Sequence, residues 1–387
     1  MLSQVPSTQQ WLSQFMPEHR DIAETLLDNL LVVSSEEMRN DLKVFIEGLA
    51  TEGSEKAALL PIREVSEGES IYDSEDHTRT PLLQASEESL GSEAFISNLY
   101  TELTRSKPMQ FLQQRNGDRS FPPSISFLRE NKYKHLFLVD DLIGSGDRVV
   151  SYLDALLNNK TINSWVSYGF LRIHIVSFMA TKRGYAVVSS AIRRRKNITL
   201  NVMHRAPSLT DLPESDDILQ LCRAYAKKGT RYPLGYKDSA VRVVFTHSAP
   251  NNLPSILYQN VHKKYRPDNV PSLKATQWIA LFPRRSIPNQ FKQDIVMLKE
   301  RNSPRYDLKR LIILVSEKVN SRETLAIVMN KQSAYIQILI DLGIRFGLLK
   351  EERTGLSVTS MGQVELQSKS LTNYPIERNK NFYYPVY

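Results

Sequence analysis

The chain has 387 residues, a formal net charge of +8 and a sequence pI near 9.3. This length allows two or three domains, each with its own core. The single cysteine, Cys222, excludes an internal disulfide and a four-cysteine zinc site, so we expect a reducing compartment, the cytoplasm. No apolar run approaches the roughly 18 to 20 residues that span a bilayer, and the N-terminus lacks a signal-peptide pattern. We therefore expect a protein that is neither secreted nor embedded in a membrane.

The charge is unevenly distributed along the sequence. Residues 51–100 contain eleven acidic and three basic residues, whereas residues 261–310 contain twelve basic and four acidic ones. Such a basic stretch is either a solvated surface or a contact with nucleic acid or an acidic protein, and the sequence leaves both open.

Residues 1–56 are predicted to form an N-terminal helical layer, because apolar residues between 9 and 50 recur at helical spacing. The apolar run "AALLPIREV" (57–65) is the first predicted core strand, and a polar, acidic loop follows it. These features place the start of an α/β domain near residue 57.

Strands and helices alternate in the middle of the chain. Strands are expected at 135–139, 172–180 and 199–204, with helices at about 147–158 and 184–195 between them. A further strand is expected at 241–248, after a loop-like segment (206–240). This alternation predicts a mostly parallel sheet, and we interpret residues 57–285 as one α/β domain. The predicted helix ends in the cations Arg193 to Lys196, which are either a solvated helix end or a contact with nucleic acid.

Residues 286–370 are predicted to be a basic linker followed by a winged helix of three helices and a hairpin, and residues 371–387 form an aromatic tail. The expected contacts with nucleic acid or a partner, on the third helix and the hairpin, are Tyr335, Gln337, Arg345, Lys350 and Arg353. These side chains are few for sequence-specific reading of DNA. We therefore expect docking to a protein or to a protein-bound nucleic acid.

Two carboxylates, Asp140 and Asp141, follow the buried strand at 135–139. Ligands of open α/β sheets bind at the carboxyl ends of the strands. Gly144 and Gly146 allow a close backbone approach, and the helix starting near Asp147 offers free N–H groups to a phosphate. The segment therefore predicts a sugar-phosphate site. A dinucleotide-binding turn and a solvated acidic pair are the alternatives, although the dinucleotide fingerprint is incomplete.

The same segment, "LFLVDDLIGSGDRV", resembles the phosphoribosyl-pyrophosphate motif of type I phosphoribosyltransferases. The resemblance implies that Asp140 and Asp141 hold the ribose hydroxyls and that Mg²⁺ binds the pyrophosphate. It assigns the 5′-phosphate to Gly144, Ser145, Gly146, Asp147 and Arg148. Two positions depart from the family pattern. Gly144 lies where several purine-using members carry a carboxylate that contacts the base, and Arg148 lies where a threonine is usual.

A second resemblance covers more of the chain. "LGYKDSAVRVVFTHSAPNNLPSILY", "WIALFPRR" and the N-terminal "WLSQF" are similar to phosphoribosyltransferase-like effectors of bacterial anti-phage conflict systems, including some retrons. The resemblance implies a toxic effector that a partner keeps inactive, such as a reverse transcriptase with its DNA–RNA product.

Four further residues are candidates for this site. Arg63 follows the first core strand, where the pyrophosphate loop of the resembled fold lies, and it is either the pyrophosphate cation or the start of a solvated loop. His247, Asn251 and Asn252 follow the strand at 241–248 and are candidate base-side contacts, although Pro-Asn-Asn is also a common turn.

From these patterns we expect a phosphoribosyltransferase that acts on phosphoribosyl pyrophosphate or a nucleotide with Mg²⁺. The alternative is a catalytically silent regulator that senses the same ligand and binds DNA through the winged helix.

Overall fold

The computed structural model describes residues 1–50, 55–66, 68–81, 90–116, 119–262, 277–301, 304–329, 331–352 and 355–367. The chain forms two compact units, Met1–Asp294 and Ile295–Tyr387. The N-terminal helices belong to the same unit as the α/β region. The predicted aromatic tail (371–387) and Arg353 lie outside the described residues.

A four-stranded sheet in the order β2-β5-β6-β7 is the centre of the first unit. Its strands are β2 (Lys56–Pro61), β5 (Tyr133–Ile143), β6 (Arg172–Ala180) and β7 (Ile198–Arg205). Every neighbouring pair is parallel. The residues of β5 from Leu136 to Val139 are fully buried, as expected for a strand covered on both faces. The predicted parallel α/β sheet is therefore confirmed.

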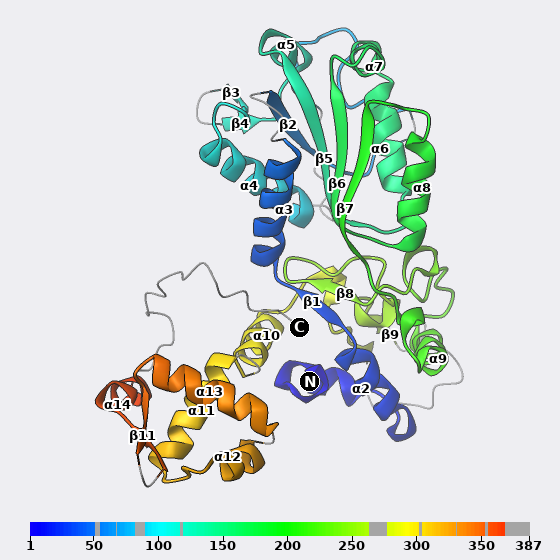
Figure 1. Cartoon of the computed structure of the whole chain (residues 1–387). Helices are drawn as coiled ribbons and strands as arrows, with labels where there is room; N and C mark the ends of the chain where they lie inside the picture. Colours follow the sequence, from blue (N-terminus) through cyan, green and yellow to red (C-terminus); the bar gives the residue numbers. More distant parts are fainter. Residues whose placement is uncertain are drawn as a thin grey trace. The chain divides into compact units, whose positions relative to one another are not determined.

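Helices cover both faces of this sheet (Figure 1). On one face lie α3 (Ser35–Leu49) and α4 (Leu90–Ser106), and on the other lie α6 (Asp147–Leu157) and α8 (Lys182–Ile192). Large side chains such as Phe137 and Tyr152 are completely buried in the core between them. The sheet is thus held rigidly in the middle of three layers, which fixes the ends of its strands.

Several shorter elements complete the first unit. The helices are α1 (Pro6–Leu12), α2 (Arg20–Asp28), α5 (Ile125–Glu130), α7 (Lys160–Ser167), α9 (Ser215–Tyr225) and α10 (Asn289–Arg301), which continues into the second unit. The remaining strands are β1 (Leu31–Val33), β3 (Gln114–Asn116), β4 (Arg119–Phe121), β8 (Val243–Phe245), β9 (Val261–His262) and β10 (Gln277–Trp278).

The strand predicted at 241–248 is shorter than expected and lies outside the four-stranded sheet. It is β8, which pairs in parallel with β1 in a separate two-stranded sheet, with Val33 opposite Phe245. A run of three apolar residues such as Leu31–Val33 is too short to show a hydrophobic periodicity. The sequence therefore does not distinguish this strand from the helices on either side. The segment predicted to be loop-like (206–240) also contains α9.

The second unit contains α11 (Pro304–Ser316), α12 (Arg322–Met329) and α13 (Ser333–Arg345), then the antiparallel pair β11 (Leu349–Glu352) and β12 (Gly355–Val358), and α14 (Ser360–Gln367). Its core is built from buried side chains of the three helices and the hairpin, including Leu311, Leu325, Ile336, Leu339 and Leu349. Three helices followed by a hairpin is the element order from which the winged helix was predicted, and the winged helix itself stays a prediction. None of the described helices is long and apolar enough to span a membrane.

Candidate functional site

The acidic pair lies in the last residues of β5, directly before the loop that leads to α6. Asp140 and Asp141 are 2% and 8% exposed. The strand continues to Ile143, and Gly146, with φ of +88°, turns the chain into α6. A side chain is disfavoured at that φ, so a glycine is suited to this turn. The segment therefore places two buried carboxyl groups beside the N-terminus of a helix.

Arg148 and Asp140 form a close ion pair within this segment. Nη2 of Arg148 donates to both carboxylate oxygens of Asp140, at 2.7 Å each. Burial raises the pKa of Asp140 to about 7, although Arg148 acts in the opposite direction. The Arg148 side chain is 39% exposed, whereas Asp140 is buried. The residue assigned to the phosphate by resemblance thus binds one of the carboxylates assigned to the ribose.

His247 contacts the second carboxylate. Its Nε2 lies 3.0 Å from Oδ2 of Asp141, and its Nδ1 lies 3.0 Å from Oγ of Ser35, the first residue of α3. The rings of Phe95 and Phe245 stack on the imidazole with centroids at 5.4 and 5.3 Å. The imidazole is therefore held by two hydrogen bonds and two rings beside the acidic pair. Ser35 is distant in sequence, and no local pattern pointed to it.

Asn252 occupies the space beside Gly144. A Cβ at Gly144 would lie 2.4 Å from the amide atoms of Asn252, so no side chain fits there without displacing the amide. Nδ2 of Asn252 donates to Oγ of Ser239 at 2.9 Å, and the residue is 6% exposed. Asn251 is exposed, and its carbonyl oxygen accepts from the backbone N–H of Tyr236. Asn252 therefore places its amide against the loop.

A lysine that the sequence analysis did not single out also reaches the loop. Nζ of Lys237 forms an ion pair with Asp147, and Oγ of Ser145 donates to the same carboxylate at 2.7 Å. Burial acts to raise the pKa of Asp147, but hydrogen bonds from Lys237 and Ser145, with further attraction from Lys237 and Arg183, leave it below its ordinary value. Arg148, Lys237 and Arg183 therefore lie near the start of α6, each close to a carboxylate with which a phosphate would compete.

The backbone that carries Lys237 is in an uncommon conformation. Lys237, Asp238 and Ala240 have φ values of +53°, +53° and +45°, and Gly235 has φ of +92°. Non-glycine residues with positive φ carry local strain that the surroundings must balance. No local sequence pattern indicates that Lys237 turns toward the loop.

Arg63 lies near the same edge of the sheet as the acidic pair. It follows β2, in which Pro61 pairs with Val139. Arg63 is 3% exposed and donates from Nη1 and Nη2 to Oε1 of Glu69 at 3.1 Å. The guanidinium already has a carboxylate partner, so binding a pyrophosphate would require it to exchange or share this partner.

The contact residues predicted in the second unit are partly engaged within that unit. The hydroxyl of Tyr335 donates to Oδ2 of Asp307 at 3.0 Å, and burial raises the pKa of Tyr335 to about 12. Oε1 of Gln337 accepts from Nη1 of Arg322 at 3.2 Å. Tyr335 therefore joins two helices of the unit.

Two other predicted contacts lie on the surface of the second unit. Arg345 is exposed at the end of α13. Lys350 is exposed on β11, where its Nζ lies 2.6 Å from a carboxylate oxygen of Glu352.

A family model described as PRTase-CE matches residues 8–284. No curated protein matches the chain. Among solved structures, a point mutant of RuvB from Thermotoga maritima is 11% identical, covering 63% of this chain and 90% of that chain with a TM-score of 0.16. A score that low carries no structural argument.

Proposed function

We propose a function from one premise: the chain belongs to the PRTase-CE family, whose model matches residues 8–284. On this basis the chain is phosphoribosyltransferase-like. We infer that it binds phosphoribosyl pyrophosphate or a nucleotide and transfers the phosphoribosyl group. The observation that carries the proposal is the buried pair Asp140 and Asp141 at the end of β5, immediately before the N-terminus of α6.

Ligand binding in this proposal begins with an exchange of partners at Arg148. A guanidinium binds phosphate through two parallel hydrogen bonds, as it binds a carboxylate. The 5′-phosphate therefore competes with Asp140 for Arg148, and Lys237 and the free N–H groups of α6 assist it. Asp140, once released, accepts a hydrogen bond from a ribose hydroxyl, and Asp141 accepts another.

Transfer breaks the bond from the anomeric carbon to its leaving group and forms a bond to the acceptor. The positive charge that develops on the sugar needs nearby negative charge and a site that excludes water. Asp141, and Asp140 when it is ionised, would supply this negative charge. His247 holds Asp141 in place and lies on the side where we propose that the acceptor enters, near Asn252.

Mg²⁺ is the proposed metal. Within the described residues, no group of three or more His, Cys, Asp or Glu side chains is placed to hold an ion. Mg²⁺ is commonly bound through one or two carboxylates together with substrate phosphates, and the oxygens of Asp140 and Asp141 fit that mode. When bound, the ion would neutralise the departing pyrophosphate.

The effector role is a further part of the proposal and rests on the resemblance of the segment 233–285 to proteins of anti-phage conflict systems. We propose a toxic activity that a partner, such as a reverse transcriptase with its DNA–RNA product, keeps inactive. Expression of the chain alone should then slow bacterial growth, and the Asp140→Ala/Asp141→Ala variant should not. Equal toxicity of the two proteins would refute this role.

One observation favours the alternative of a sensor that binds the ligand without turnover. The space beside Gly144 holds the amide of Asn252, and an amide is not a general base. If the chain binds the ligand but produces no pyrophosphate and consumes no nucleotide, the result would favour the sensor over the enzyme.

Calorimetric titration with phosphoribosyl pyrophosphate and Mg²⁺ tests the binding step. Losing hydrogen bonds to a charged ligand costs about 1.5 to 3 kcal/mol, so Arg148→Ala should weaken binding by about ten-fold or more. Arg39→Ala is the matched control, because Arg39 forms a 3.0 Å ion pair with Glu102 between α3 and α4. Equal affinities of the two variants would contradict the proposed role of Arg148.

A further inference from the structure

Four consecutive cations form an exposed turn between α8 and β7. This turn lies at the amino ends of the sheet strands, whereas the acidic pair lies near their carboxyl ends. This basic turn is Arg193–Lys196, and each of its residues is exposed. It lies at the amino end of β7, where Ile198 pairs with Ile173 of β6, whereas the acidic pair lies near the carboxyl end of β5. The basic turn is therefore separate from the candidate phosphoribosyl site.

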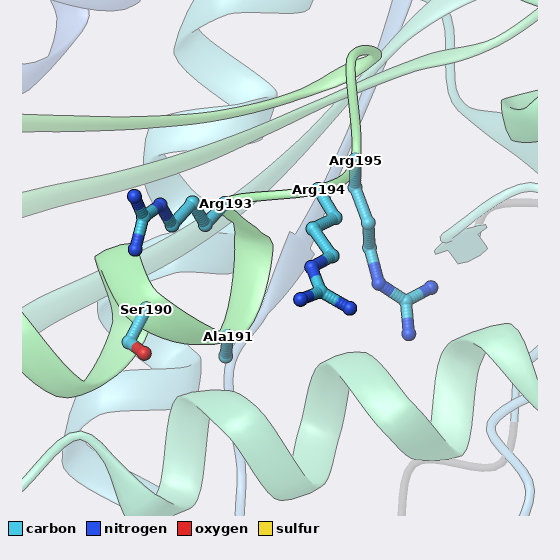
Figure 2. Close-up of a pocket in the computed structure, with 5 residues that line it drawn as sticks. All are labelled: Ser190, Ala191, Arg193, Arg194 and Arg195. Carbon is cyan, nitrogen blue, oxygen red and sulfur yellow. The ribbon is translucent and has the colours of Figure 1, made fainter.

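Three residues of the basic turn, Arg193, Arg194 and Arg195, line a hollow of about 680 Å³ together with Ser190 and Ala191. Figure 2 shows that the side chains of Arg194 and Arg195 extend in the same direction, while that of Arg193 extends in another. Among the ion pairs of the described residues, none involves a residue of the basic turn. The positive charge of this turn is thus not neutralised by carboxylates of the described part of the chain.

Two exposed aromatic rings lie in the neighbouring turn. Tyr168 and Phe170, between α7 and β6, are 76% and 60% exposed, with ring centroids 6.2 Å apart. Large aromatic side chains are usually buried, and single exposed ones need no explanation, but two adjacent ones beside a positive surface form a pattern. We call residues 168–171 the aromatic turn.

Contacts of the flanking residue Asn197 place the aromatic turn next to the basic turn. Nδ2 of Asn197, the residue after the basic turn, donates to the carbonyl oxygen of Val166 at 2.7 Å. The carbonyl oxygen of Asn197 accepts from the N–H of Ile173 at 2.9 Å. A Cβ at Gly169, between the two rings, would lie 3.6 Å from the Asn197 amide. The two turns are therefore neighbours at the same strand ends, one carrying the exposed rings and the other the exposed cations.

We propose that this surface binds single-stranded nucleic acid. Proteins that bind single strands without sequence preference combine cations that contact the phosphates with aromatic rings on which unpaired bases stack. Both components are present here, and a duplex, whose bases are already stacked, would use only the cations. The inference does not depend on the proposed enzymatic function, because no residue of this surface belongs to the acidic pair or its loop.

The first test measures binding of the full chain to a fluorescein-labelled oligothymidylate by fluorescence anisotropy at several salt concentrations. Each phosphate contact to a single strand contributes about 0.7 to the slope of log affinity against log salt. Replacing the three arginines of the basic turn with alanine should therefore reduce this slope by about 2. The charge-matched control is Arg223→Ala/Lys227→Ala/Lys228→Ala, near the end of α9, which should leave the slope unchanged.

The second test separates base stacking from charge. Stacking of a base on a protein ring contributes about 1 to 3 kcal/mol, so Tyr168→Ala/Phe170→Ala should weaken binding of the single strand about five-fold or more. The same variant should leave the salt slope and the affinity for a duplex of equal length unchanged. Both rings are largely exposed, so the substitutions should preserve the fold, which the thermal unfolding midpoint would verify.

A third measurement locates the contact even if other parts of the chain also bind the probe. An oligothymidylate carrying 5-iododeoxyuridine is cross-linked by light to the full chain, and the modified peptides are mapped by mass spectrometry. We expect modification at Tyr168 or Phe170. The proposal is overturned if the wild-type chain does not bind at low salt, if the arginine variant behaves like its control, if removing the rings leaves single-strand affinity unchanged, or if no cross-link maps to the aromatic turn.

Discussion

Replacing Asp140 with asparagine should stabilise the protein at high pH and have little effect at low pH. Burial raises the pKa of Asp140 to about 7 in the folded chain, from an ordinary value of 3.8. Between these two values the unfolded chain has released a proton that the folded chain retains, so the stability of the wild-type protein decreases as the pH rises through this range. Asparagine does not ionise, so the variant does not lose stability in this way as the pH rises.

The size of the effect follows from the shift in pKa. Each unit corresponds to about 1.36 kcal/mol, so a shift of about three units corresponds to about 4 kcal/mol above pH 7. The substitution also leaves Arg148 without its carboxylate, but the attraction of Arg148 is already included in the pKa of Asp140. We therefore expect Asp140→Asn to increase the free energy of unfolding by about 2 to 4 kcal/mol at about pH 8, and by nearly zero at about pH 4.

Urea unfolding followed by tryptophan fluorescence provides the assay, because the three tryptophans, Trp11, Trp165 and Trp278, all lie in the first unit. Asp147→Asn is the control of opposite sign, since the pKa of Asp147 is lowered in the folded chain. That lowered pKa contributes stability above the pKa of the unfolded chain, and this contribution is lost as the pH falls. If Asp140→Asn destabilises the protein equally at both pH values, burial does not dominate the energetics of this carboxyl group.

Three other substitutions test the surroundings of the acidic pair. Gly144→Ala should cost about 1 to 3 kcal/mol of stability, because its Cβ would lie 2.4 Å from the amide of Asn252. Adding Asn252→Gly in the same chain should recover most of this loss in urea unfolding, and additive effects of the two substitutions would argue against the close approach. Lys237→Met removes an ion pair in which the lysine side chain is 29% exposed and that of Asp147 is 42% exposed, so it should change stability by less than about 1 kcal/mol. The same substitution should weaken the binding of phosphoribosyl pyrophosphate in calorimetry, and unchanged affinity would exclude Lys237 from the phosphate site. His247→Ala should lower the free energy of unfolding by about 1 to 3 kcal/mol because it removes a partner of buried Asp141. His247→Gln should lower it less if the hydrogen bond to Asp141 contributes. Equal losses for the two variants would indicate that only the packing of the imidazole ring contributes.

The sequence predicted those parts of the fold in which the signal is local. The apolar run before Asp140, the two acids and the glycines identified β5, its loop and α6 together, because the order of these residues along the chain is also their order in space. His247 was a candidate for a similar reason: it follows a strand, and the structure places it 3.0 Å from Asp141.

The remainder depends on contacts between distant segments or on side-chain conformation. The pairing of β1 with β8 joins residues more than two hundred positions apart, and each strand has only three residues. Sequence alone does not reveal that Arg148 turns back onto Asp140 instead of toward solvent. Nor does it reveal that the backbone at Lys237 has a positive φ that directs this lysine to the loop. Such features follow from the packing of the whole unit and not from any local pattern.

Phosphorus NMR tests most directly whether the acidic pair binds a phosphoribosyl ligand. Phosphoribosyl pyrophosphate, with Mg²⁺ and a mixture of cellular nucleotides, is incubated with the wild-type chain or with the Asp140→Asn/Asp141→Asn variant. We expect that the phosphoribosyl signals broaden, or that pyrophosphate appears, only with the wild-type chain. Signals that remain sharp and unconverted with both proteins, or that change equally with both, would contradict it.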